Sequence, residues 1–192
     1  MNRVRAHLIS VIVLVLALLA PAGPAVAEGE AGFEVTRLEA VLKDEWYLLD
    51  ADIDYRFSKE ALEALANGVP LTLEVRLQVR RKGAWIWEKD LQDVRLRYQL
   101  RYQALSEIYQ VDDMQSGSQQ SFVTRQSALA ALGKIREFQA IESARLKAGT
   151  EYLVSLKTAL DIEALPLPLR PMAYLTPAWN LSSEWKTWPL VP

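Results

Sequence analysis

Two segments with strict alternation between apolar and polar residues constrain the fold of this chain more than any other feature. They cover residues 71–80 and 94–103, with a turn at Lys82-Gly83-Ala84 between them. Their apolar positions are Leu71, Leu73, Val75, Leu77 and Val79, then Val94, Leu96, Tyr98, Leu100 and Tyr102. A period of two residues is typical of strands with one buried and one solvated face. We therefore predict two long antiparallel strands.

The rest of the chain also favours strands. We predict further strands at residues 33–42, 46–57, 151–160 and 179–188, and a short hairpin from residues 108–111 and 121–123. Helices are expected at residues 59–66 and 125–135, after Ser58 and Thr124 as N-caps. Alternating prolines in residues 165–171 predict an extended or edge-like segment. The pattern indicates a mainly β fold, an immunoglobulin-like β-sandwich with two short helices. An α+β sheet with helices on one face is the alternative.

The N-terminus has the three parts of a secretory signal peptide. Arg3 and Arg5 form a positive region, residues 8–20 form an apolar run whose only polar residue is Ser10, and Ala25-Val26-Ala27 is a cleavage pattern. We predict cleavage after Ala27, which leaves residues 28–192 as a single β-rich domain in the periplasm. A retained N-terminal anchor is the alternative.

The composition excludes several classes of function. The chain has no cysteine, and its one histidine, His7, lies in the predicted signal peptide. The exported part thus lacks the residues for Ser-His-Asp and Cys-His catalysis, thiol redox chemistry and His or Cys metal sites. The whole chain has 22 Lys and Arg against 24 Asp and Glu, and losing Arg3 and Arg5 makes it more acidic, which argues against nucleic acid as a ligand. We expect a protein that is not an enzyme, with no catalytic residues, cofactor or metal.

Three aspartates recur at every second position, at Asp50, Asp52 and Asp54. A calcium loop of the EF-hand type would need a Gly after the third acid and a Glu at its twelfth position, where the chain has Tyr55 and Ala61. We instead expect the three carboxylates on the solvated face of a strand, beside the arginines of residues 76–80 or 95–101.

The predicted strand pair carries the most basic cluster, next to two tryptophans. The candidate partner-binding residues are Arg76, Arg80, Trp85, Trp87, Arg95, Arg97 and Arg101. As strand residues, Trp85 and Trp87 would share one face. Such a surface suits an anionic partner, but a solvated strand face neutralised by Glu88, Asp90, Asp93 and the aspartate row is the favoured explanation. Trp179, Trp185 and Trp188 form a second group, and which tryptophans are exposed stays open.

Four segments resemble an uncharacterised family of exported proteobacterial proteins, a domain of unknown function sometimes labelled proline-rich signal peptide protein. They are residues 46–55, 61–71, 161–170 and 181–185. The family has no assigned activity, so the resemblance implies no catalytic residues. It does imply an association with a membrane sensor kinase, because genes of such proteins often lie beside one.

Two functions remain in view. The first is a periplasmic, non-enzymatic binding protein of the cell envelope, with the periplasmic region of a sensor kinase as one candidate partner. The second is a binder or carrier of an anionic lipid or glycan through the basic face flanked by tryptophans. We expect no nucleic acid partner and only weak peripheral contact with a membrane.

Overall fold

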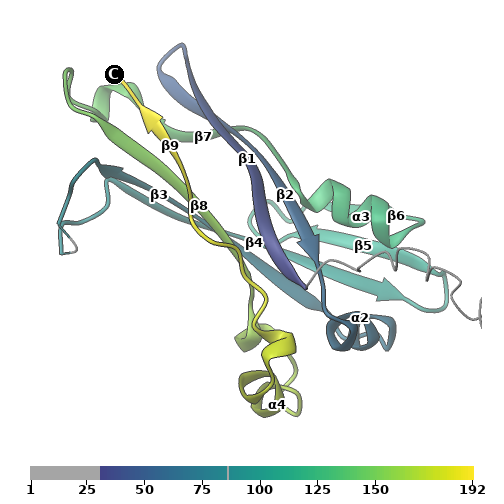
Figure 1. Cartoon of the computed structure of the whole chain (residues 1–192). Coiled ribbons are helices and arrows are strands. Elements are labelled where there is room, and N and C mark those ends of the chain that lie inside the picture. Colours follow the sequence, from purple (N-terminus) through teal and green to yellow (C-terminus); the bar gives the residue numbers. More distant parts are fainter. Residues whose placement is uncertain (1–30, 86) are drawn as a thin grey trace, which may run out of the picture. The chain divides into compact units, whose positions relative to one another are not determined.

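The computed structural model describes residues 31–85 and 87–192 (Figure 1). The predicted signal peptide, residues 1–27, and its cleavage site lie outside the described residues. The strands are β1 (Gly32–Lys43), β2 (Trp46–Arg56), β3 (Leu71–Arg81), β4 (Gln92–Gln103), β5 (Ile108–Asp113), β6 (Gln119–Phe122), β7 (Lys134–Glu142), β8 (Tyr152–Leu160) and β9 (Lys186–Leu190). The helices are α2 (Lys59–Ala66), α3 (Arg125–Leu132) and α4 (Arg170–Leu175), with 3-10 turns η1 (Ser143–Arg145), η2 (Ile162–Ala164) and η3 (Pro177–Trp179).

The strands form two antiparallel sheets. One has the order β1-β2-β7, and the other has the order β6-β5-β4-β3-β8-β9. In Figure 1, β1 and β2 cross over the larger sheet, and β1 contacts β8 and β9. The prediction of a mainly β fold that builds a sandwich from two sheets is confirmed.

The core lies between the inner faces of the two sheets. The alternation predicted for residues 71–80 is confirmed on β3, and the strand predicted at residues 46–57 has the same pattern. The buried side chains are Leu71, Leu73, Val75, Leu77 and Val79 on β3, and Tyr47, Leu49, Ala51, Ile53 and Tyr55 on β2. The hydroxyls of Tyr55 and Thr158 meet at 3.3 Å and join β2 to β8 across this core. Phe33 contacts the rings of Tyr55 and Phe57 edge-on, with centroids 4.9 and 5.1 Å apart.

Helices α2 and α3 begin where their caps predict. Ser58 Oγ accepts a hydrogen bond of 3.2 Å from the Ala61 N–H, and Thr124 Oγ1 accepts one of 3.1 Å from the Ser127 N–H. The helix expected at residues 125–135 ends at Leu132, however, and the chain enters a strand, β7, that the sequence did not predict. β7 is formed by pairing with β2, a contact between distant residues that local pattern does not record.

The C-terminal part differs from the prediction. Residues 165–171 are not an edge strand, because Pro171 sits in the first turn of α4, where a missing N–H costs nothing. The last strand is confined to Lys186–Leu190, and Trp179 is buried in η3. None of the helices in the described ranges is long and apolar enough to cross a bilayer.

Candidate functional site

The predicted basic residues lie on the outer face of the six-stranded sheet, where β3 pairs with β4. In this register Arg76 lies opposite Arg95, and Glu74 lies opposite Arg97. Arg101 lies opposite Gln110 of β5. The tryptophans do not lie on a strand, because β3 ends at Arg81 and β4 starts only at Gln92. Trp85 and Trp87 belong to the connecting loop, so the expectation that they share a strand face is wrong.

Most of the predicted basic residues are bound to carboxylates. Arg76 holds Asp93 with two hydrogen bonds, of 3.0 Å from Nε and 2.6 Å from Nη2. Arg80 Nε lies 2.6 Å from an Asp90 oxygen. The remaining pairs are Arg81 with Glu88, Lys82 with Glu151, Arg97 with Glu74 and Asp161, and Arg101 with Asp112. The outer face is therefore far less positive than its arginine count indicates.

These ion pairs shift the pKa values of the residues that form them. The hydrogen bonds from Arg76 hold the pKa of the Asp93 carboxyl below its usual value, and the same contact raises the pKa of Arg76. The hydrogen bond from Arg81 likewise lowers the pKa of Glu88. Both carboxylates therefore stay ionised at neutral pH and continue to neutralise the arginines beside them.

One row across three strands keeps an excess of positive charge. Arg76 lies opposite Arg95 on one side and opposite Lys157 of β8 on the other, and residues directly opposite share a face. No ion pair within 4.0 Å joins Arg95 or Lys157 to a described carboxylate, whereas Arg76 is paired with Asp93. We call Arg76, Arg95 and Lys157 the cation row. The sequence does not single out Lys157, since alternation shows its face but not its register with β3.

Trp85 and Trp87 stack on each other at the tip of the β3–β4 hairpin. Their rings are nearly parallel, with an interplanar angle of 11° and centroids 5.2 Å apart. They stay 66% and 79% exposed, so the stack projects into solvent. Arg80 fixes the loop by donating to the carbonyl oxygens of Trp85, at 3.2 Å, and Glu88, at 3.3 Å. The hairpin thus presents two large aromatic faces on an anchored loop.

An open hollow lies beside this aromatic stack. Its volume is about 460 Å³, and Trp87, Arg80, Lys89, Asp90 and Asp93 are among the residues that line it. We call Trp85, Trp87 and this hollow the hairpin site. The hairpin site offers a binding partner an aromatic surface next to positively and negatively charged side chains. A larger hollow, of about 700 Å³, lies among β2, β5 and α3 and includes none of the predicted site residues.

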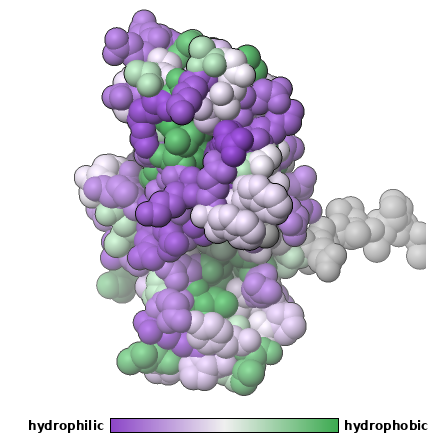
Figure 2. Space-filling view, turned by 90° about the vertical axis from the view of Figure 1, so that its left-hand side faces the viewer, coloured by the Kyte–Doolittle hydropathy of each residue, from purple (hydrophilic) through white to green (hydrophobic). Residues whose placement is uncertain are grey.

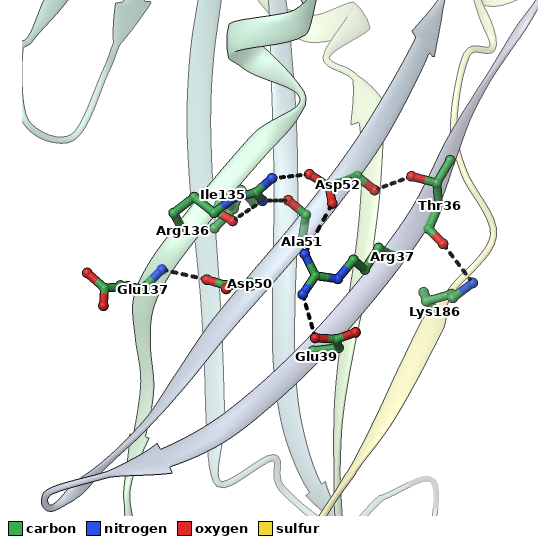
Figure 3. Close-up of polar contacts among 10 residues, drawn as sticks. All are labelled: Thr36, Arg37, Glu39, Asp50, Ala51, Asp52, Ile135, Arg136, Glu137 and Lys186. Carbon is green, nitrogen blue, oxygen red and sulfur yellow. Dashed lines mark hydrogen bonds and ion pairs between the residues drawn. The ribbon is translucent and has the colours of Figure 1, made fainter.

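The aspartate row lies on the other sheet, away from the arginines expected beside it. Asp52 is bound by Arg136 of β7 and lies 3.6 Å from Arg37 of β1 (Figure 3). Asp50 accepts a hydrogen bond from the Glu137 backbone. Asp54 pairs with Arg56 of its own strand at 3.3 Å. The expected pairing with Arg76, Arg80 or residues 95–101 is therefore wrong, because β2 pairs with β1 and β7 instead of with β3 or β4.

The outer face of the small sheet thus uses its carboxylates for structure. In residues 31–85 and 87–192, no group of three or more His, Cys, Asp or Glu side chains is placed to hold a metal ion. The second tryptophan group is divided: Trp179 is buried, and Trp185 and Trp188 are only partly exposed. Trp85 and Trp87 are the more exposed pair.

Comparison with known proteins yields one family. The family described as "Domain of unknown function (DUF4390)" matches residues 30–189. No curated protein and no solved structure matches the chain.

Proposed function

The chain belongs to the family described as "Domain of unknown function (DUF4390)", and from that premise and the geometry of the site we propose that it is a non-enzymatic binding protein of the cell envelope. In this proposal its contact with another envelope protein is the hairpin site. The envelope location rests on the N-terminal sequence, whose charged, apolar and small-residue regions have the order of a secretory signal. The periplasmic region of a sensor kinase is one candidate partner.

The observation that carries the proposal is the exposed stack of Trp85 and Trp87. Tryptophan is strongly enriched among the residues that supply most of the binding energy at protein interfaces. A partner that covers an exposed aromatic side chain gains more binding free energy than one that contacts a buried side chain, because the exposed apolar surface is still available for transfer from water. The neighbouring arginines are held by Asp90 and Glu88, so a partner need not desolvate unpaired cations to reach the rings.

The first experiment is a capture from solubilised envelope followed by reconstitution. Residues 28–192 would be immobilised, the bound protein identified, and its purified soluble region titrated against the wild type and a Trp85→Ala/Trp87→Ala variant. We expect the double variant to lose about 2 kcal/mol or more, near thirtyfold in Kd.

A matched control is available in two other exposed apolar side chains, Leu105 and Val123. A Leu105→Ala/Val123→Ala variant should bind within about twofold of the wild type, because these side chains lie outside the hairpin site. Equal binding by the tryptophan variant and the wild type would refute the hairpin site. Substrate turnover by the purified protein, lost on changing one carboxylate, would refute the non-enzymatic assignment.

The cation row favours a second candidate function, the binding of an anionic lipid or glycan. Like charges directly opposite each other destabilise a sheet unless an anion offsets them, and Arg95 and Lys157 flank Arg76 in this way. The probes are vesicles that contain phosphatidylglycerol and, separately, a sulfated glycan. Binding should fall with salt and with Arg95→Gln/Lys157→Gln, but not with the equal charge change Lys59→Gln/Lys147→Gln. Binding that ignores salt or the first variant would exclude this candidate.

A further inference from the structure

A second exposed surface lies around α4, at a different end of the domain from the hairpin site. Leu167 is 74% exposed and Leu175 is 82% exposed, and Met172 and Tyr174 are each more than half exposed. Only one of the 18 residues 164–181, Arg170, is charged. We call the surface formed by Leu167, Met172, Tyr174 and Leu175 the α4 end. Four large apolar side chains exposed within the nine residues 167–175 are more than the scattered exposure normal for a soluble surface.

The exposure of these side chains is fixed by packing. Leu165, Ala173 and Trp179 of the same segment are buried members of the core and attach the segment to it. Arg170 Nε donates a hydrogen bond of 2.7 Å to the Leu165 carbonyl, and Arg170 also lies 3.7 Å from Glu163. The Tyr174 hydroxyl donates to Glu163. The single cation of the segment is thereby paired with the neighbouring Glu163, and this carboxylate also meets the hydroxyl of Tyr174 beside the exposed apolar side chains.

The α4 end lies where the chain enters the domain. β1 begins at Gly32, opposite Arg56 at the end of β2, and α2 follows directly. Both α2 and α4 contact η3, so these elements gather at one end, the lower end in Figure 1. Figure 2 shows hydrophobic residues at this lower end and a largely hydrophilic band across the middle of the same face. The β3–β4 hairpin lies at the far end of β3 from α2.

In the form of the chain that keeps its N-terminal segment, the alternative to cleavage after Ala27, the sequence that precedes the domain at this end points to the occupant. It contains the apolar run of residues 8–20, which is separated from Ala31 by ten residues. Ten residues span at most about 35 Å when extended, so whatever lipid the run meets lies within reach of this end. Aliphatic side chains bordered by a tyrosine match the apolar interior and polar boundary of a bilayer.

We propose that, in the chain that keeps its N-terminal apolar run, the α4 end rests on a lipid bilayer. Leu167, Met172 and Leu175 enter the apolar region, and Tyr174 lies at the level of the headgroups. Because the segment offers no unengaged cation, this contact requires neither anionic lipid nor low salt, in contrast to binding through the cation row. The contact is independent of the hairpin site.

The absence of cysteine from the chain allows a direct test. In the full chain, single variants Leu167→Cys and Leu175→Cys would carry a spin label and be reconstituted into phosphatidylcholine vesicles. The measurement is made at 0.1 and 0.5 M NaCl, between which the screening length of charges falls from about 10 Å to below about 5 Å. Val41→Cys and Val191→Cys are matched controls, since both side chains are 65% or more exposed and lie near the opposite end of β1. Such exposed substitutions leave the fold intact.

Collisions with oxygen, which concentrates in lipid, and with a water-soluble nickel chelate report the position of each label. We expect labels at 167 and 175 to be several-fold more accessible to oxygen relative to the chelate than labels at 41 and 191, at both salt levels. Equal accessibility at all four positions would overturn the proposal by placing the α4 end in water. Labels at 167 and 175 shielded from both reagents would overturn it by showing that a protein surface or a second copy covers them. Neither result depends on Trp85 or Trp87, so failure here leaves the proposed function standing.

Discussion

The Asp50 carboxylate accepts a hydrogen bond of 2.8 Å from the backbone N–H of Glu137. Glu137 has a φ of 48°, a conformation that non-glycine residues seldom adopt, and it lies where the register of β2 and β7 shifts between Leu49 and Ala51. The N–H at such an irregularity has no ladder partner. A carboxylate that the sequence places in an acidic row therefore stabilises a β-bulge in the neighbouring strand.

Removing this acceptor should weaken the edge of the small sheet. We expect Asp50→Ala to lower the free energy of unfolding by about 1 kcal/mol, and Asp50→Asn to lower it less because the amide oxygen still accepts. Asp54→Ala is the control and should cost under about 0.5 kcal/mol, since its ion pair with Arg56 is exposed. Urea denaturation measures all three. Equal losses at positions 50 and 54 would show that the bulge does not depend on Asp50.

Gly133 should be intolerant of a side chain for reasons of space. A Cβ at this position would lie 2.2 Å from the carbonyl oxygen of Ile53, whose N–H donates to the Gly133 carbonyl at 2.8 Å. Backbone atoms cannot yield as a flexible side chain can, so Gly133→Ala should cost about 3 kcal/mol. Gly32→Ala meets no atom within 4 Å and should change stability by less than about 0.5 kcal/mol. Thermal unfolding of the two variants compares them, and a stable Gly133→Ala protein would contradict the close approach of α3 to β2.

Tyr55 should make the fold sensitive to alkali. Burial raises the pKa of its phenol above the usual value of 10.0. The stability that depends on the neutral phenol is fully present below about pH 10 and is lost as pH rises, because the unfolded tyrosine ionises first. Tyr55→Phe should therefore reduce the fall in unfolding free energy between about pH 9 and 11. The slope should not vanish, since burial also raises the pKa values of Tyr47 and Tyr98. An unchanged slope in Tyr55→Phe would contradict this assignment.

Asp52 should make the stability of the fold fall as the pH becomes acidic. The hydrogen bond from Arg136 lowers the pKa of the Asp52 carboxyl below its usual value of 3.8. Its contribution is fully present above about pH 5 and is lost as pH falls through the lowered pKa. Asp52→Asn should therefore be less stable than the wild type at pH 7, with the difference shrinking toward about pH 3. The effect is modest because the side chain is 32% exposed. Urea midpoints across this range measure it, and a constant difference would refute the ion pair as its source.

Local pattern was sufficient for much of the fold. Alternation predicted the inner faces of β2, β3 and β8, because one wet and one dry face impose a period of two wherever the partner lies. Caps at Ser58 and Thr124 predicted the starts of α2 and α3, since a cap acts on N–H groups only two or three residues away. β7 was missed because its alanine- and leucine-rich lead, residues 128–132, continues a helical pattern up to Gly133.

The candidate site was predicted less completely. Arg76, Arg80, Arg95, Arg97 and Arg101 were recognised as one face, but their carboxylate partners were only partly named. Asp93 and Asp90 were among the expected partners, while Asp112 and Asp161 come from strands and turns distant in sequence. The stacking of Trp85 on Trp87 depends on loop geometry, which a strand pattern does not contain.

The sequence by itself determined the class of fold, the buried faces of the strands with strict alternation, and the lack of His and Cys after residue 27, because these depend on composition and on the spacing of neighbours. Only the tertiary structure decided which strands pair, which arginine meets which carboxylate, and that Trp85, Trp87, Leu167 and Leu175 stay in solvent. Register and exposure arise from contacts between segments far apart in the chain, and a one-residue change in pairing would turn every side chain of the shifted strand to the other face of its sheet.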